Sequence, residues 1–169
     1  MIKTCLQNLF HLLVWLGCGK TTIGKKLAAK YNFIFCDTDI LIEKKFNATL
    51  QNIKQKNGYK FLRKEEEEII LELDDMYEVI ATGGSAVYSS KAMNHLKTLS
   101  TIIFINTPFV DIKKRIGDAG HRGFAMPDGF SIKQAYEERL PLYNHFQDIS
   151  IDGSLSVNEV ISQIEGHCF

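Results

Sequence analysis

The segment Gly17–Thr22, which reads G-C-G-K-T-T, constrains the fold of this chain more than any other feature. An apolar segment, Leu9–Trp15, precedes it, and a segment with helix-forming residues, Lys20–Lys30, follows. Glycines let consecutive backbone N–H groups turn toward an anion, and the N-terminus of the next helix adds its partial positive charge. The order of strand, loop and helix therefore predicts a phosphate-binding P-loop rather than a chance glycine cluster at a helix start.

The positions of this loop have distinct expected roles. We expect Lys20 to reach the β- and γ-phosphates of ATP and the Thr21 hydroxyl to bind Mg²⁺. The full motif requires glycine at position 14, where this chain has Val14 followed by the bulky Trp15. Because a β-branched residue lacks the backbone freedom of glycine, we expect altered loop geometry and weaker nucleotide binding. The expected nucleotide-binding positions are Gly17, Cys18, Gly19, Lys20, Thr21 and Thr22.

The composition is that of a globular protein. The chain has 169 residues, 45% hydrophobic and 24% charged, which suits a single domain over residues 1–169. A formal net charge of zero argues against nucleic-acid binding, which needs a basic face. Four cysteines without CxxC spacing indicate a reduced, cytoplasmic protein. The rest of the sequence contains no run of about 18 apolar residues, so no membrane-spanning helix is expected.

The N-terminus permits a second interpretation. A lysine, the apolar run Leu9–Leu16 and then Cys18 resemble a secretory or lipoprotein signal. Polar residues such as His11 interrupt that run, and cleavage at Cys18 would destroy the phosphate loop. We therefore expect a strand here.

Short apolar strands alternate with helical segments, without repeats or low-complexity linkers. This pattern predicts a three-layer α/β fold whose parallel sheet is covered by helices on both faces. The glycine-bearing segment 118–131 is expected to be a mobile loop. The predicted strands are Leu9–Trp15, Phe33–Cys36, Glu78–Ala81, Thr101–Ile105 and Ile149–Ile151. The predicted helices are Lys20–Lys30, Asp39–Lys45, Leu50–Lys56, Tyr59–Leu73, Ser90–Leu96, Val110–Ile116, Ile132–Phe146 and Val157–Glu165.

Ligand-binding residues follow two of these strands. Asp37 and Asp39 close the second strand, and their i, i+2 spacing puts both carboxylates on the same side. One can orient Mg²⁺ through water while the other meets an acceptor hydroxyl, although acidic residues also cap helices. Gly83 and Gly84 follow the third strand, where open α/β sheets bind substrates, although a tight turn would also use them.

Arginines occur in three further motifs. Arg63 lies in F-L-R-K-E-E, shortly after a glycine, and Arg139 lies in R-L-P-L-Y. Arg115 precedes the glycine-bearing segment, and Arg122 lies within it. A planar guanidinium binds a carboxylate with two parallel hydrogen bonds, and a loop arginine can stabilise a transferring phosphoryl group. The alternatives are solvated arginines or, for Arg139, an ion pair on a helix surface.

Together with the P-loop, these motifs resemble the shikimate kinase family, over the chain from Leu9 to about Ile161. The resemblance implies a fold like that of nucleoside monophosphate kinases, a five-stranded parallel sheet in the order 2-3-1-4-5 with a lid at about 118–131. It also implies transfer of phosphate from ATP to shikimate with Mg²⁺, giving 3-phosphoshikimate for the synthesis of chorismate and the aromatic amino acids. A monomer without nucleic-acid or membrane partners is expected.

The resemblance assigns a role to each motif residue. Asp37 joins Thr21 on the metal side, and Asp39 holds the acceptor hydroxyls and can accept a proton. Arg115 lies near the adenine, and Arg122 is the lid arginine that contacts ATP. The implied catalytic residues are Lys20, Asp39 and Arg122. The implied substrate-binding residues are Asp39, Arg63, Gly83, Gly84 and Arg139.

The chain departs from the family pattern at several positions. The family's F-R-x-x-E fits best with Leu62 in place of the phenylalanine, Arg63 on the arginine and Glu66 on the glutamate. A rival register keeps Phe61 as the phenylalanine but loses the arginine. Ser85 replaces the third glycine of a triple glycine, and the usual R-P-L of the lid reads R-G-F at 122–124.

Two helical features are ambiguous in the sequence. The acidic run Glu65–Glu68 is expected to be mostly a solvated helix face, with Lys64 and Glu68 as an i, i+4 pair. Phe46, Tyr59 and Phe61 either wall the acceptor pocket or pack in the core.

Two other functions fit parts of the pattern. A kinase of another small alcohol is favoured by Ser85 and the altered lid. A nucleotide-binding regulatory protein without turnover is favoured by Val14 and Trp15.

Overall fold

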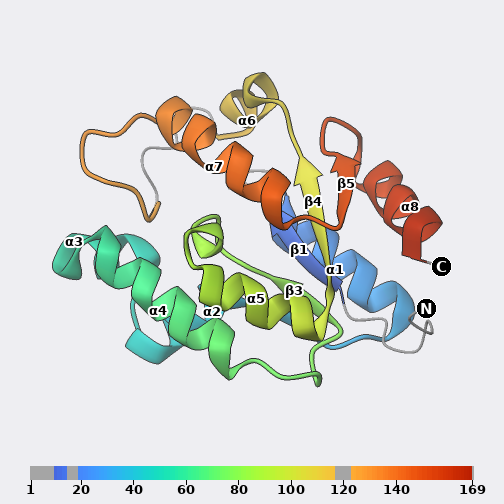
Figure 1. Ribbon diagram of the computed structural model, residues 1–169, viewed down its shortest axis with the longest axis horizontal. Coiled ribbons are helices and arrows are strands. Elements are labelled where there is room, and N and C mark those ends of the chain that lie inside the picture. The colour runs from blue at the N-terminus through green and yellow to red at the C-terminus, as the bar shows by residue number, and fades with distance from the viewer. Residues whose placement is uncertain (1–9, 15–18, 117–122, 169) are drawn as a thin grey trace.

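A computed structural model describes residues 10–14, 19–116 and 123–168 of the chain. Helices and strands alternate along most of it (Figure 1). The strands are β1 (Phe10–Val14), β2 (Phe35–Asp37), β3 (Val79–Ala81), β4 (Thr101–Asn106) and β5 (Ile149–Asp152). The α-helices are α1 (Lys20–Tyr31), α2 (Thr38–Phe46), α3 (Leu50–Asn57), α4 (Tyr59–Glu72), α5 (Ser90–Leu99), α6 (Phe109–Ile116), α7 (Ile132–Phe146) and α8 (Val157–Cys168). A short 3₁₀ helix, η1 (Ala86–Tyr88), follows β3.

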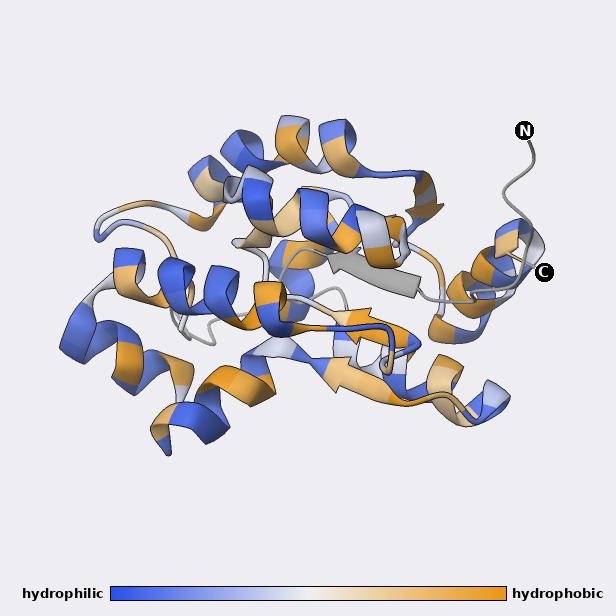
Figure 2. Ribbon diagram, turned by 60° about the horizontal axis from the view of Figure 1, so that its bottom comes forward, coloured by the Kyte–Doolittle hydropathy of each residue, from blue (hydrophilic) through white to orange (hydrophobic). Residues whose placement is uncertain are grey.

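The strands form one parallel sheet in the order β2-β3-β1-β4-β5, the order that the family resemblance implies. The connection from β1 through α1 to β2 runs toward one edge of the sheet, and that from β3 through α5 to β4 runs toward the other. Because such crossovers are right-handed, α1 and α5 lie on opposite faces. The sheet is therefore a central layer between helices, with its apolar strands in the interior (Figure 2).

The main core lies between this sheet and its helices. All three residues of β3 are fully buried, and Ile102–Ile105 of β4 are at most 2% exposed. Gly24 of α1 permits close packing, because a Cβ there would stand 2.4 Å from the Phe35 ring. A second, smaller cluster joins α2, α3 and α4 beside the sheet. Its buried members are Ile42, Ile53, Leu62, Ile69 and Ala125.

Most of the predicted elements occur within a few residues of their expected bounds. The apolar segment before the phosphate loop is a strand, β1, paired on both sides by β3 and β4. Residues 10–14 thus form the strand expected before the phosphate loop. The 3₁₀ helix Ala86–Tyr88 was not predicted. None of the helices described is both long and apolar enough to cross a bilayer.

Candidate active site

The functional residues gather at the carboxyl ends of the parallel strands, where open α/β sheets bind ligands. Helix α1 begins at Lys20, directly after Gly19, whose positive φ of 80° suits a glycine. Its first turn carries no acidic residue, and Gly19 provides no side-chain cap. The partial positive charge of this helix end is therefore uncompensated by local side chains, as an anion site requires.

Lys20 connects the phosphate loop to the two aspartates predicted at the end of β2. Its Nζ donates hydrogen bonds to Asp39 Oδ2 and, at 3.2 Å, to the carbonyl of Thr82, and it lies 3.6 Å from Asp37 Oδ1. Burial lowers the pKa of Lys20, but attraction to Asp39 and Asp37 outweighs this, so the pKa lies above its usual value. The lysine stays positively charged between the phosphate loop and the aspartates.

The Thr21 hydroxyl and the Asp37 carboxylate lie side by side near Lys20. Thr21 Oγ1 donates to Asp37 Oδ2 at 2.7 Å, and Asp37 Oδ1 accepts from the Asp39 N–H at 3.1 Å. This second bond caps α2, so the two predictions for Asp37, metal side and helix cap, describe compatible contacts. Asp37 is only 5% exposed, which fixes its carboxylate in one orientation.

A cavity of about 310 Å³ adjoins the start of α1. It lies between Gly19 and Thr22 on one side and Gly153 and Val157 on the other, and Arg115 also lines it. Arg115 donates to the carbonyl of Gly153 at 2.9 Å, so its guanidinium is tied to the loop after β5. The volume is at the lower end of ordinary ligand pockets and suits a nucleotide base.

These residues fit Mg²⁺-bound ATP. The uncompensated end of α1 and Lys20 suit phosphates, and the hydroxyl and carboxylate of Thr21 and Asp37 are the hard oxygen ligands that Mg²⁺ prefers. In the described part of the chain, Cys, His, Asp and Glu form no cluster of three or more that could hold a metal. Mg²⁺ bound with phosphates needs only one or two protein ligands, so the pair is sufficient. The predicted residues Gly17, Cys18 and Arg122 lie outside the described residues.

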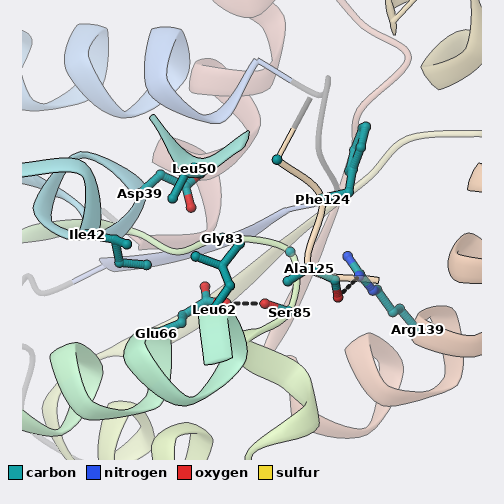
Figure 3. A pocket seen from close by; sticks show the side chains of 12 residues that line it. Asp39, Ile42, Leu50, Leu62, Glu66, Gly83, Ser85, Phe124, Ala125 and Arg139 are labelled. Carbon is teal, nitrogen blue, oxygen red and sulfur yellow. Dashed lines mark hydrogen bonds between the residues drawn. The ribbon is translucent and has the colours of Figure 1, made fainter. Parts of the chain in front are cut away.

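A second cavity, which we call the acceptor cavity, lies beside Lys20 and Asp39 (Figure 3). Four of the five predicted substrate-binding residues line it, namely Asp39, Gly83, Gly84 and Arg139, whereas Arg63 lines a neighbouring pocket. Its apolar walls come from α2, α3, α4 and the segment after residue 122. Its other lining residues are Ile42, Leu50, Leu62, Glu66, Ser85, Gly123, Phe124 and Ala125.

The two predicted carboxylate-binding arginines converge on one oxygen atom. Arg63 Nε donates to the main-chain carbonyl of Ala125 at 3.0 Å, and an Arg139 terminal N–H donates to the same oxygen at 3.1 Å. Tyr88 lies between them, with its ring centre 3.7 Å from the Arg63 guanidinium carbon and 5.3 Å from that of Arg139. Arg139 is only 2% exposed, so the alternative of a surface ion pair is wrong. Burial, aided by the nearby charge of Arg139, lowers the pKa of Arg63.

The segment Gly123–Met126 closes the acceptor cavity. Phe124, Ala125 and Met126 are buried, and the Gly123 N–H donates to Gln51 Oε1 of α3 at 2.6 Å. The remaining space, about 20 Å³, has room for about one water molecule. The end of the predicted lid therefore packs into the site in this conformation.

The acidic run of α4 is not a solvated face. Glu65 and Glu66 are 6% and 3% exposed, and the expectation for this pair was wrong because their face of α4 packs against its neighbours. Glu65 pairs with Lys45 at 2.6 Å, and Glu66 accepts a hydrogen bond from the Ser85 hydroxyl. Burial, together with the charge of Asp39, raises the pKa of Glu66 to about 7. The predicted pair of Lys64 and Glu68 is present at 3.2 Å.

For Phe46 and Phe61, the structure favours core packing over lining the acceptor cavity. Phe46 and Phe61 stack edge to face in the second core cluster, whereas Ile42, Leu50 and Leu62 line the cavity. Leu62 at the cavity supports the register that places Arg63 on the family's arginine. Apolar residues at i, i+7 and i+8 on α4, namely Leu62, Ile69 and Ile70, could have identified this face. Nothing local in the sequence indicated that Leu50 or residues 123–126 would line the cavity.

The sheet order, the phosphate-loop helix and the cavity lined by Asp39 and Arg139 define a P-loop kinase of small molecules. The family model for shikimate kinase matches residues 16–168. The chain is 34% identical to the shikimate kinase of Staphylococcus aureus over 157 residues, covering 90% of this chain and 89% of the relative. It is 30% identical to that of Aquifex aeolicus over 155 residues, covering 91% and 92%.

A solved structure gives the same result. The shikimate kinase of Acinetobacter baumannii in complex with shikimate matches with a TM-score of 0.85 and 26% identity, covering 95% of this chain and 93% of that one. The chain belongs to the shikimate kinase family.

Proposed function

We propose that this protein transfers a phosphoryl group from ATP to shikimate and forms 3-phosphoshikimate, for chorismate and aromatic amino acid synthesis. The observation that carries the proposal is the convergence of Arg63 and Arg139 on the main-chain oxygen of Ala125, which lines the same cavity as Asp39. Two guanidinium groups around one point suit the carboxylate of an acidic acceptor, which simple alcohols lack. Lys20, at the start of the helix that follows the phosphate loop, donates to Asp39, which lines the same cavity.

The chain's own residues supply binding and orientation. ATP with Mg²⁺, when bound, supplies the phosphoryl group and neutralises its charge. Asp39 is placed to accept a hydrogen bond from the reacting hydroxyl, and Lys20 holds the Asp39 carboxylate at that position. Gly83 and Gly84 let the acceptor approach the backbone closely. Arg122 is proposed to contact the transferring group from the lid, and Arg115 to contact the nucleotide.

Acceptor binding requires a movement. The Ala125 carbonyl and an acceptor carboxylate cannot both take the position between Arg63 and Arg139. We therefore propose that residues 123–126 withdraw when the acceptor enters and then cover it, which excludes water from the site. We also propose that residues 1–169 are a single domain, with a lid at about 118–131, and act as a cytoplasmic monomer.

A turnover assay tests the function. ADP formation is measured with Mg·ATP against shikimate, quinate, gluconate and small neutral alcohols, with Lys20→Ala as the blank. Shikimate-dependent turnover that Asp39→Asn abolishes is the expected result. Turnover with another acceptor alone would contradict shikimate as the substrate.

One observation favours a different small hydroxy acid as the acceptor. Ser85 fills the position of a family glycine and lines the acceptor cavity, which changes the shape presented to an acceptor. Another small hydroxy acid is the substrate if the panel ranks it above shikimate. ATP binding without turnover on any acceptor would instead identify a nucleotide-binding regulatory protein.

A further inference from the structure

Ser85 makes a contact that no glycine could make. It follows Gly84 at the carboxyl end of β3 and is 6% exposed. Its hydroxyl donates a hydrogen bond to Glu66 Oε2 of α4, beside it at the wall of the acceptor cavity (Figure 3). The bond adds a polar contact between α4 and the segment after β3.

The other oxygen of Glu66 is left for a ligand. Glu66 is 3% exposed, and its Oε1 has no hydrogen-bond partner among the residues that the structure describes. A buried polar atom without a partner is costly, so such an atom at a cavity wall points to a bound hydrogen-bonding group. Glu66 lines the acceptor cavity directly.

Asp39 brings a second carboxylate oxygen to the same place. A Cβ built on Gly83 would stand 2.5 Å from Glu66 Oε1 and 2.7 Å from Asp39 Oδ1. The two oxygens therefore flank one point above the Gly83 backbone, and only glycine leaves that point open. Two acceptor oxygens so placed match two neighbouring hydroxyl groups of one molecule.

We propose that Ser85 is a specificity-determining positioning residue, which holds Glu66 so that Glu66 Oε1 and Asp39 Oδ1 together bind adjacent hydroxyl groups of the acceptor. This inference rests on the proposed function, because it takes the acceptor to bind in this cavity. A site built to hydrogen-bond a hydroxyl rejects analogues that lack it, since its buried polar atom then stays unpaired. Ser85 thereby selects vicinal diols among small hydroxy acids.

The test combines Ser85→Ala with acceptors that lack one hydroxyl. Asp39 is proposed to hold the reacting hydroxyl at C3, so the adjacent hydroxyl left for Glu66 is the one at C4. The probes are therefore shikimate, 4-deoxyshikimate and, as a control, 5-deoxyshikimate. We expect Ser85→Ala to raise the KM for shikimate roughly 5- to 30-fold, with kcat and the KM for ATP changed less than about 3-fold. With the unmodified protein, 4-deoxyshikimate should show a similar rise in KM. Ser85→Ala should then raise that KM little further.

Two further variants distinguish positioning from general damage. Ser85→Thr retains the hydroxyl and should restore part of the acceptor affinity. Ser90→Ala, at an exposed serine near the start of α5, is the matched control and should leave all constants unchanged. Full additivity of the Ser85→Ala and 4-deoxy penalties, or an unchanged KM for shikimate, would overturn the proposal.

A measurement without turnover separates this inference from the proposed function. Side-chain carboxyl resonances of Glu66 are titrated by NMR in the unmodified protein and in Ser85→Ala. The Ser85 hydrogen bond lowers the pKa of Glu66, so its loss should raise that pKa further. A protein that phosphorylates no shikimate but shows this rise contradicts the proposed function alone, and an unmoved pKa overturns the pairing of Ser85 with Glu66.

Discussion

Thr21 and Asp37 are joined by a 2.7 Å hydrogen bond from Oγ1 to Oδ2, which links the start of α1 to the end of β2. The bond holds together the two residues that we expect to bind Mg²⁺, and Asp37 also accepts a hydrogen bond from the Asp39 N–H. A preformed pair of this kind lowers the cost of ordering the ligands when Mg²⁺ arrives with the nucleotide.

The first prediction concerns this pair. Asp37→Asn removes the charge but keeps the shape, and we expect the Mg²⁺ concentration for half-maximal turnover to rise about 10- to 100-fold. The measurement is turnover against Mg²⁺ at fixed ATP. Thr21→Ala should act in the same direction. Thr98→Ala removes an exposed hydroxyl that donates to the His95 carbonyl at 2.7 Å and serves as the control, with an unchanged curve. An unchanged curve for Asp37→Asn would exclude it from the metal side.

The second prediction concerns the arginines. We expect Arg63→Ala to raise the KM for shikimate roughly 10- to 150-fold, because a hydrogen bond to a charged group contributes about 1.5–3 kcal/mol. Arg139→Lys keeps the charge but loses the planar fork, so it should also weaken acceptor binding. Lys64→Ala, at the exposed neighbour of Arg63, is the control. A KM for Arg63→Ala equal to that of the control would mean that the acceptor carboxylate binds elsewhere.

The third prediction concerns two glycines that share a left-handed backbone. Gly123 and Gly129 have φ values of 56° and 79°, but only at Gly123 would a Cβ meet other atoms, 2.7 Å from Leu50 Cβ. We expect Gly123→Ala to lower kcat/KM for shikimate about 10-fold, because the segment over the acceptor cavity can no longer pack.

Gly129→Ala is its matched control. It carries the backbone strain without the clash, so its kcat/KM should stay within about 3-fold of the original value. Equal losses in both variants would show that packing of Gly123 against Leu50 does not matter for turnover.

The fourth prediction follows from the pKa of Glu66. This pKa is about 7 in the folded protein against an ordinary value of 4.5, so the folded state retains the proton longer than the unfolded state does. The stability that this gives is complete below about pH 4.5 and is lost as the pH rises through about 7. Glu66→Gln stays neutral throughout. Between pH 4.5 and pH 8, the free energy of unfolding of Glu66→Gln should therefore rise relative to that of the unmodified protein, by at most about 3 kcal/mol.

Urea unfolding of the two proteins at a series of pH values measures this difference. Because every other titrating group is shared, the subtraction isolates Glu66. Parallel stability profiles would contradict a raised pKa at this position.

Much of the fold could be predicted from the sequence because its signals are local. Short apolar strands alternate with helical segments, and a glycine-rich loop precedes α1. Both signals depend on the preferences of neighbouring residues in the sequence. The exact bounds were less predictable, since Asp37 both ends β2 and caps α2. The helix η1 has no periodic apolar pattern and was missed for that reason.

The site was predictable where a motif carries its own chemistry. Lys20, Asp37 and Asp39 meet as expected, and Arg63 and Arg139 converge although the chain separates them widely. Burial was not predictable, because it depends on which face of α4 packs inward. Glu65 and Glu66 look like solvent-facing residues in an acidic run, and only tertiary contacts show otherwise.

The oxygen that holds Arg63 and Arg139 together belongs to the main chain of Ala125, not to a side chain. No single substitution deletes a carbonyl that every amino acid carries. The competition from this carbonyl can therefore be tuned only indirectly, for example through how firmly the buried Phe124 and Met126 anchor it. Sequence drift at these two apolar positions would change how strongly the protein competes with its own ligand, while the arginines and the chemistry remain the same.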